Sequence, residues 1–369
     1  MRISAPGKLF LSGEWAVLEI GNPGIVVAVN KRVHVEIDDY DFISVDVDDY
    51  NIKNAQASFE AGRLLWDKDV LDNERERLCF VKHAIEISLR YLGTWAPFKL
   101  HTWGEESQLE VDGSVKKIGF GSSAAVVAST VSALLAFNGK DIRTREMKDI
   151  IYKLSVIAHY FAQGKVGSGF DIAASVYGGA FIYKRFDPEW LLKELESKSI
   201  KELVEEEWPS FYIEELKIMK DLILLVGWTK ESASTSAMVK QMNEFKAQNK
   251  DEYDSIFNSI SQLVEELINA WKNNDKEKIL ELLKRNEELL RGLGEKSGVN
   301  IETEELKQLA ELANENGAAG KLSGAGGGDC GIAICFDSNI ADSVKKAWQD
   351  AGLYLLDVTI DYDGIKMVE

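Results

Sequence analysis

The first half of the chain alternates short apolar runs with turn residues. The apolar runs have the length and composition of β-strands, and turn signals such as Gly21-Asn22-Pro23-Gly24 separate them. The predicted strands are residues 25–30, 32–37 and 42–47. Apolar residues at helical spacing predict one helix that opens at Ser122 and another that begins near Thr144, a favourable N-cap. This half is therefore expected to be mixed α/β.

The second half has a different pattern. A charged stretch, 189–207, precedes Trp208-Pro209 and is predicted to be a partly helical connection between two domains. Beyond it, short apolar runs predict strands and amphipathic periodicity predicts helices. The predicted strands are 222–228, 331–336 and 354–360, and the predicted helices are 253–271, 279–293, 304–316 and 340–349. Gly317 takes the position expected after a helix C-terminus. This order predicts an antiparallel sheet with helices on one face, an α+β layer.

Length and charge narrow the classes of function. A chain of 369 residues, 45% of them hydrophobic, is long enough for two packed cores. The apolar runs are too short to span a bilayer and the N-terminus is a poor signal peptide, so we expect a cytoplasmic protein. The net charge of −18 disfavours nucleic acid and membrane as partners. An anionic ligand must therefore be met by locally placed Lys, Arg and backbone N–H groups.

Cysteine and histidine usage excludes two further classes. The three cysteines, Cys79, Cys330 and Cys335, are too few and too scattered for a disulfide framework or a zinc site, and the four histidines lack metal-ligand spacing. A bound metal would use oxygen ligands, which points to Mg²⁺.

One glycine-rich segment has the features of a phosphate site: Lys117-Ile118-Gly119-Phe120-Gly121-Ser122-Ser123-Ala124-Ala125. Its glycines allow close backbone approach and positive φ, and its serines open a helix whose N-terminal N–H groups favour an anion. It is neither a P-loop nor a dinucleotide fingerprint, because the required lysine and third glycine are absent. The alternative is a serine N-cap on an alanine-rich core helix.

Three more segments suggest chemistry. A run of glycines between apolar stretches, Lys321 to Cys330, suits backbone approach to a ligand, with a flexible loop as the alternative. Asp171 follows three glycines and is a candidate base or orienting group, with a helix N-cap as the alternative. Lys8 lies between a predicted Pro-Gly turn and an apolar strand and is expected to be held in place, with a surface lysine in a hairpin as the alternative.

Together, and in this order, these segments resemble the motifs of the GHMP kinases. PGKLFLSGEW is similar to the first motif of that family, GFGSSAAV to the second and LSGAGGGDCGIAI to the third, and the matches extend from Pro6 to Ile334. The resemblance implies the two-domain GHMP kinase fold, of class α+β. Its N-terminal domain, expected at 1–188, would be a ribosomal-protein-S5-like α/β domain that binds ATP. Its C-terminal domain, expected at 210–369, would be a ferredoxin-like α+β domain that covers the substrate.

Within the family, two stretches are similar to the branch that phosphorylates 5-phosphomevalonate. They are residues 159–171 and 227–236, and Trp15 after Glu14 agrees with them. The implied reaction transfers the γ-phosphoryl group of ATP to 5-phosphomevalonate in the mevalonate pathway of isoprenoid biosynthesis, by a monomer or homodimer. The alternatives are a mevalonate kinase, another GHMP small-molecule kinase or a non-catalytic GHMP ligand-binding protein.

The resemblance also implies roles for individual residues. Lys8 and Asp171 would be catalytic, and the serines Ser122 and Ser123 would be ligands of Mg²⁺. The implied ATP-binding residues are Lys117, Gly119, Gly121, Ser122, Ser123 and Ala124. The candidate substrate-binding residues are Lys165, Ser168, Gly169, Arg185, Ser234, Thr235, Ser323, Gly324, Ala325 and Gly326.

One position departs from the family. Mevalonate kinases have a glutamate ligand to Mg²⁺ on the helix before the catalytic aspartate. Tyr160 takes that position here, with His159 and Gln163 beside it.

Overall fold

The computed structural model describes residues 1–105, 108–111, 114–164, 167–231 and 235–368. Within this described part, nine strands form a large sheet. Seven of them follow the order β10-β9-β2-β6-β3-β4-β5, while β1 pairs with β2 and β15 pairs with β1. Its strands are β1 (Arg2–Ser12), β2 (Gly24–Asp39), β3 (Ile43–Val47), β4 (Ile52–Glu60), β5 (Arg63–Trp66), β6 (Phe98–Gly104), β9 (Ala180–Lys184), β10 (Tyr212–Glu215) and β15 (Lys366–Val368).

The central strand β2 corrects the sequence prediction. The runs 25–30 and 32–37 are one continuous strand, which pairs with β1 along most of its length and passes through the half-exposed Asn30 and Lys31. The ladder with β1 shifts register at this polar step, from Val29 opposite Gly7 to Arg32 opposite Pro6. Pairing resumes on either side of it, so the strand continues although the two residues interrupt the apolar pattern.

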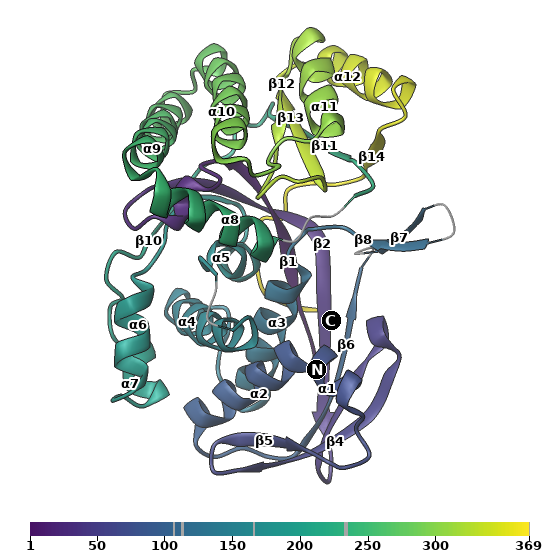
Figure 1. The fold of residues 1–369 in the computed structure, drawn as a ribbon. Coiled ribbons are helices and arrows are strands. Elements are labelled where there is room, and N and C mark those ends of the chain that lie inside the picture. The colour runs from purple at the N-terminus through teal and green to yellow at the C-terminus, as the bar shows by residue number, and fades with distance from the viewer. Residues whose placement is uncertain (106–107, 112–113, 165–166, 232–234, 369) are drawn as a thin grey trace.

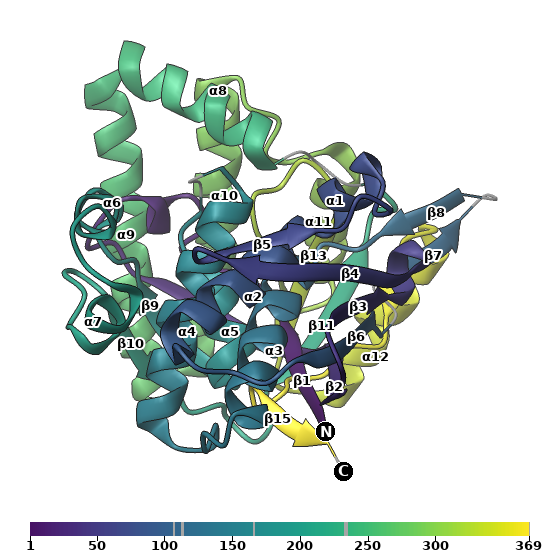
Figure 2. The ribbon, with the colours of Figure 1, turned by 90° about the horizontal axis from the view of Figure 1, so that it is seen from below.

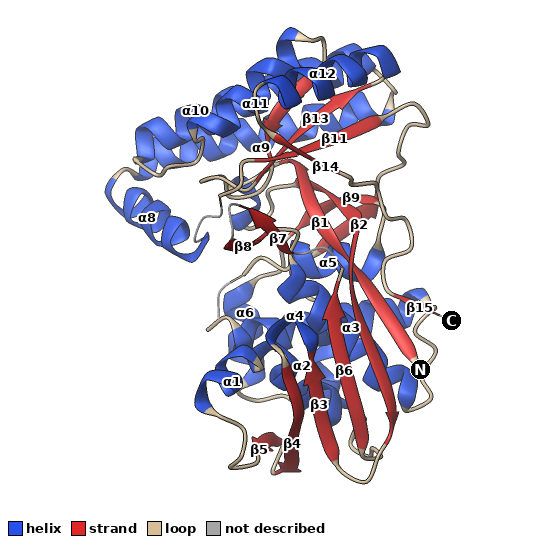
Figure 3. Cartoon of the chain, turned by 90° about the vertical axis from the view of Figure 1, so that its right-hand side faces the viewer, coloured by secondary structure: helices blue, strands red, loops and turns tan. Residues whose placement is uncertain are grey.

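Helices gather on one side of this sheet (Figure 3). They are α1 (Asp72–Arg77), α2 (Cys79–Leu92), α3 (Ser122–Phe137), α4 (Arg145–Ala162), α5 (Phe170–Tyr177), α6 (Pro188–Leu195) and α7 (Ile200–Glu205). The alanine-rich α3 is the most enclosed of these, because it packs against α2, α4, α5 and the strands β1 and β2. Thr144 caps α4 as predicted, since its Oγ1 accepts from the N–H of Met147 at 3.2 Å.

The charged stretch 189–207 forms most of α6 and all of α7. This stretch packs against the large sheet, because Leu191, Leu203 and Val204 are buried in the core of that sheet. The predicted helical content is confirmed, while the role of this stretch as the connection between two domains stays a prediction.

The second sheet is antiparallel, as predicted, with the order β12-β13-β11-β14. Its strands are β11 (Ile223–Trp228), β12 (Ala319–Leu322), β13 (Cys330–Cys335) and β14 (Tyr354–Leu356), and the helices of this half are α8 (Thr235–Gln248), α9 (Lys250–Lys272), α10 (Lys276–Ser297), α11 (Glu304–Glu315) and α12 (Ser338–Asp350). The pattern predicted α9 to α12 but neither α8 nor β12. Figure 1 shows this half above the large sheet.

The two faces of the second sheet pack differently. Leu225, Ala333 and Cys335 join α11 and α12 in a small core around Trp348. Val226 and Ile334 belong to a second core that also contains residues of α9, α10 and β1. The expectation of helices on only one face is therefore wrong, because α10 packs on the other face, together with residues of β1 from the first half of the chain.

The C-terminal tail returns to the first half. Its last strand, β15, pairs with β1, and a buried ion pair joins Asp361 to Arg32. The Arg32 guanidinium also donates to the carbonyl oxygens of Ser4, at 3.0 Å, and Gly364, at 2.5 Å. The division into 1–188 and 210–369 stays a prediction, while β10 and β15 from the second range lie in the large sheet.

Two smaller features complete the fold. The hairpin of β7 (Gln108–Val111) and β8 (Ser114–Lys117) projects away from both sheets in two views (Figures 1 and 2). Short 3₁₀ turns lie at Ala16–Leu18 and Asp48–Tyr50. Among the described helices, none combines the length and the apolar character needed to cross a membrane.

Candidate active site

Lys8 lies in the middle of β1, beside the first glycine-rich segment. The strand continues through Pro6 and Gly7 with a register shift, so the predicted Pro-Gly turn is wrong. The backbone N–H of Lys8 donates to the Phe120 carbonyl at 2.8 Å, and its Nζ donates to the Gly119 carbonyl at 2.8 Å. The lysine is held at both ends, as expected, and the alternative of a hairpin surface lysine is wrong.

The second element of the site is the start of α3. Gly121 is its N-cap, with φ of 79°, and the cap makes no side-chain hydrogen bond, so the alternative of a serine N-cap is wrong. The N–H groups of Ala124 and Ala125 donate to the Gly121 carbonyl. The N–H groups at the very start of a helix have no intrahelical partner and carry partial positive charge. This geometry suits a phosphate group.

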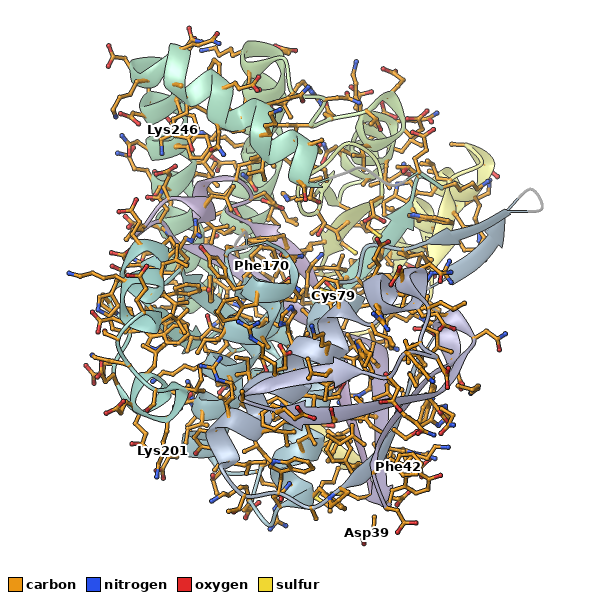
Figure 4. The ribbon with its side chains drawn as sticks, turned by 60° about the horizontal axis from the view of Figure 1, so that its bottom comes forward. Asp39, Phe42, Cys79, Phe170, Lys201 and Lys246 are labelled. Atoms are coloured by element: carbon orange, nitrogen blue, oxygen red, sulfur yellow. The ribbon has the colours of Figure 1, made fainter. Side chains whose placement is uncertain are left out.

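Asp171 and Lys8 meet at Gly121. A Cβ placed on Gly121 would lie 3.3 Å from Lys8 Cγ and 3.8 Å from Asp171 Cβ. Asp171 lies in the first turn of α5, whose N-cap is Gly169, so the alternative of an aspartate N-cap is wrong. One residue along, Phe170 (labelled in Figure 4) packs edge-on against Phe10 of β1, with ring centroids 4.4 Å apart, which fixes α5 on the strand of Lys8.

His159 connects the aspartate to a serine of the helix start. Its Nε2 lies 3.2 Å from Ser123 Oγ and 4.0 Å from Asp171 Oδ2. Burial lowers the pKa of His159, and the nearby Asp171 carboxylate only partly opposes this. The sequence pointed to His159 merely as a neighbour of the absent glutamate. The available signal was that His159 lies five residues before Gly164, on the helix that leads into the glycines before Asp171.

The third glycine-rich segment is held against β1. Ser323 Oγ accepts from the Phe10 N–H at 2.9 Å and donates to the Phe10 carbonyl at 3.0 Å. The indole N–H of Trp15 donates to the Ala325 carbonyl at 3.1 Å. Gly326 and Gly327 pack on Ile301, whose carbonyl accepts from the Gly327 N–H at 2.8 Å. The alternative of a flexible loop does not fit these contacts.

A buried ion pair lies at the start of this segment, and the sequence analysis did not predict it. Lys321 pairs with Glu14, and both side chains are 0% exposed. Lys321 Nζ also donates to the Leu322 carbonyl at 2.5 Å, while the Leu322 N–H donates to Glu287 at 2.9 Å. The available signal was that Glu14 and Lys321 are charged residues in motifs whose only other charged residues are Lys8 and Asp329.

The remaining predicted ligand-binding residues are less well defined. Arg185 donates to the carbonyls of Leu18, at 2.6 Å, and Gly167, at 3.0 Å, so its guanidinium holds the loop before α5. Ser168 accepts from the Tyr183 hydroxyl through its carbonyl, and Thr235 is exposed at the start of α8. Lys165, Ser234 and the side chain of Lys117 lie outside the described residues. The ligand-binding roles of all the residues in this paragraph, and of Gly324, stay predictions.

The donor groups near the helix start are compatible with Mg²⁺. In the described part of the chain, no group of three or more His, Cys, Asp or Glu side chains could hold a metal ion. The hydroxyls of Ser122 and Ser123 and the Asp171 carboxylate offer oxygen only. Mg²⁺ prefers oxygen and commonly takes the rest of its ligands from phosphates and water, so the residues present fit this ion.

The chain is similar to known proteins along most of its length. The family model described as GHMP kinases N terminal domain matches residues 80–179, and GHMP kinases C terminal matches residues 263–353. A phosphomevalonate kinase of Streptomyces sp. (strain CL190) is 33% identical over 98% of this chain and 97% of its own length. A phosphomevalonate kinase of Saccharolobus solfataricus is 30% identical over 100% of this chain and 99% of its own.

A solved structure extends the comparison to three dimensions. The phosphomevalonate kinase of Streptococcus pneumoniae, in complex with phosphomevalonate and AMPPNP, superposes with a TM-score of 0.82. It is 29% identical and covers 98% of this chain and 99% of its own.

Proposed function

This chain belongs to the GHMP kinase family, and we propose that it is a phosphomevalonate kinase. It transfers the γ-phosphoryl group of ATP to 5-phosphomevalonate and forms 5-diphosphomevalonate and ADP. The observation that carries the proposal is the meeting of Lys8, the start of α3 and Asp171 around Gly121. Phosphoryl transfer depends on positioning and charge stabilisation, and these groups supply both.

The start of α3 holds the β- and γ-phosphates through its N–H groups and the hydroxyls of Ser122 and Ser123. Lys8, oriented by the Gly119 carbonyl, faces the phosphoryl group that moves. A phosphate oxygen of the acceptor forms a bond to the γ-phosphorus while the bond from that phosphorus to the β–γ bridging oxygen breaks. ADP leaves with the electron pair of the broken bond.

Asp171 has an orienting role in this reaction. The acceptor is a phosphate monoester with a second pKa of about 6, so it is already ionised at neutral pH and needs no strong base. The carboxylate is fixed by the Ile172 N–H, which donates to Oδ1 at 2.9 Å, and it lies next to His159. Ser122, Ser123 and Asp171 would hold Mg²⁺, which neutralises phosphate charge when bound.

A coupled assay of ADP release tests the proposal with 5-phosphomevalonate, mevalonate, homoserine and galactose as acceptors. We expect kcat/KM for 5-phosphomevalonate to exceed the others by at least about 100-fold, because an acceptor phosphate adds charge-assisted contacts. Preference for mevalonate would reject this acceptor and keep the family. ADP release with none of the four would reject the activity.

A further inference from the structure

Asp329 connects the third glycine-rich segment to the first. It stands just before β13 in the second sheet, 210 positions beyond Gly119 in the chain. Its Oδ1 accepts from the Gly119 N–H at 3.0 Å. Burial raises the pKa of the Asp329 carboxyl, and the Gly119 N–H and the Lys8 ammonium oppose this. An aspartate from one half of the molecule therefore contacts the first glycine-rich segment, which belongs to the other half.

The carboxylate is aimed by a fixed backbone. Asp329 has φ of 67°, in the left-handed region that aspartate tolerates better than most residues. Its carbonyl accepts from the Thr229 N–H at 3.0 Å and from Thr229 Oγ1 at 3.2 Å, and its N–H donates to the Glu231 carbonyl at 2.8 Å. The segment that follows β11 thus holds both the carbonyl and the N–H of Asp329.

Gly119 is held on both sides as well. Its N–H donates to Asp329 and its carbonyl accepts from Lys8 Nζ, while the next carbonyl, of Phe120, accepts from the Lys8 N–H. Its φ is outside the left-handed region, so glycine is needed here for space: a Cβ would lie 1.6 Å from Asp329 Oδ2. Two residues later Gly121 caps α3, so these bonds set where the helix start and the lysine ammonium lie.

We propose that Asp329 is a positioning residue for phosphoryl transfer, which holds the Gly119 peptide so that Lys8 and the first N–H groups of α3 face the same phosphoryl group. This rests on the proposed function. A competing role is that the carboxylate blocks a nucleotide phosphate from the Gly119 N–H. Positioning is favoured because the hydrogen bonds of Gly119 and Phe120 to Asp329 and Lys8 all hold this segment in place. The start of α3 follows directly after these residues in the chain.

Two substitutions separate charge from geometry. Asp329→Gly removes the carboxylate and accepts the positive φ without strain. Asp329→Asn keeps an oxygen acceptor for the Gly119 N–H and also tolerates this φ. We expect Asp329→Gly to lower kcat by about 10- to 100-fold, the range for losing a hydrogen bond to a charged group, with KM for ATP changed less than about threefold. Asp329→Asn should recover most of the lost kcat.

The measurements are kcat and KM for ATP, the binding of AMPPNP to the full chain, and thermal unfolding. The control is Asp342→Ala on the exposed side of α12, which should match the parent protein. A lower KM for ATP with unchanged kcat in Asp329→Gly would establish the competing role and overturn positioning. Unchanged kcat and KM would overturn both.

A double-mutant cycle tests whether the two residues act together. If Asp329→Gly unfolds, Gly119→Ala alone keeps the proposal falsifiable, because an unchanged kcat in that variant would overturn it. Gly119→Ala should lower kcat because its methyl group meets Asp329, and Gly119→Ala with Asp329→Gly should be no slower than Asp329→Gly alone. Additive losses would mean that the two residues do not act together. The kcat and KM of each variant are compared with those of the parent protein on whichever acceptor the parent uses. Failure of the proposed acceptor would appear in the parent protein, whereas failure of the proposed role of Asp329 would appear only in the variants.

Discussion

The ammonium group of Lys8 lies 2.8 Å from the carbonyl oxygen of Gly119, a residue 111 positions further along the chain. A carbonyl oxygen orients the ammonium group without neutralising its charge. The charge therefore stays available to an anionic ligand, next to the start of α3 and to Asp171.

From this arrangement we expect Lys8→Ala to cost more activity than Asp171→Asn. Removing a preorganised charge should lower kcat by about 100-fold or more, because charge stabilisation dominates this reaction. Asp171→Asn keeps the shape of the side chain, and the ionised acceptor needs no base, so about tenfold is expected. Steady-state kinetics with 5-phosphomevalonate measure both, with the exposed Lys201→Ala on α7 as the control. An equal or reversed order would contradict this mechanism.

Gly121→Ala should damage both stability and activity. A non-glycine residue at φ of 79° costs about 1–2 kcal/mol, and the new methyl group would lie 3.3 Å from Lys8 Cγ. Gly139 offers a matched control, because its φ is 78° and a Cβ there meets no described atom within 4 Å. Thermal unfolding should show similar losses for Gly121→Ala and Gly139→Ala, while kcat should fall, by about tenfold, only in Gly121→Ala. A similar loss of kcat in both would refute the effect on Lys8.

Lys321→Met should strongly destabilise the protein. It leaves the Glu14 carboxylate buried without its cation, and one oxygen of that carboxylate already lacks a hydrogen-bond partner among the described residues. Breaking a buried pair costs about 3–5 kcal/mol. Lys346→Met removes an exposed pair with Asp350 and should cost less than about 1 kcal/mol. Urea unfolding of the two variants decides the point, and equal midpoints would show that burial does not matter here.

Glu287 should make stability depend on pH. Burial raises the pKa of Glu287 to about 8, against the opposing effect of the Lys321 ammonium. The folded state therefore retains a proton that the unfolded state releases near 4.5, and stability falls as the pH rises from about 4.5 through about 8. Glu287→Gln resembles the protonated form, so it should be more stable than the parent at pH 9, by on the order of a few kcal/mol, and similar at pH 5.

The neighbouring Glu288 supplies the control for that experiment. It is exposed on the same helix, so Glu288→Gln should follow the pH profile of the parent. Urea unfolding at pH 5, 7 and 9 compares the three proteins. A constant difference between Glu287→Gln and the parent at all three values would mean that Glu287 is ionised in the folded state.

Local features of the chain were readable in advance because their causes are local. The helix from Ser122 and the cap at Thr144 follow from spacing and side-chain chemistry within a few residues. The glycines at 119 and 121, with the serines after them, predicted a helix start suited to phosphate for the same reason. Asp171 stood out because it follows three glycines, and Lys8 because it lies between Pro6-Gly7 and an apolar run.

Long-range contacts decided the rest. Gly119 needs to be glycine because Asp329 lies against it, and Lys321 can be buried because Glu14 neutralises it across 307 positions of sequence. The continuous β2 and the return of β15 to β1 likewise depend on partner strands. Hydrophobic periodicity carries no record of which distant residues meet, whereas hydrogen bonds and ion pairs form only once both partners are in place.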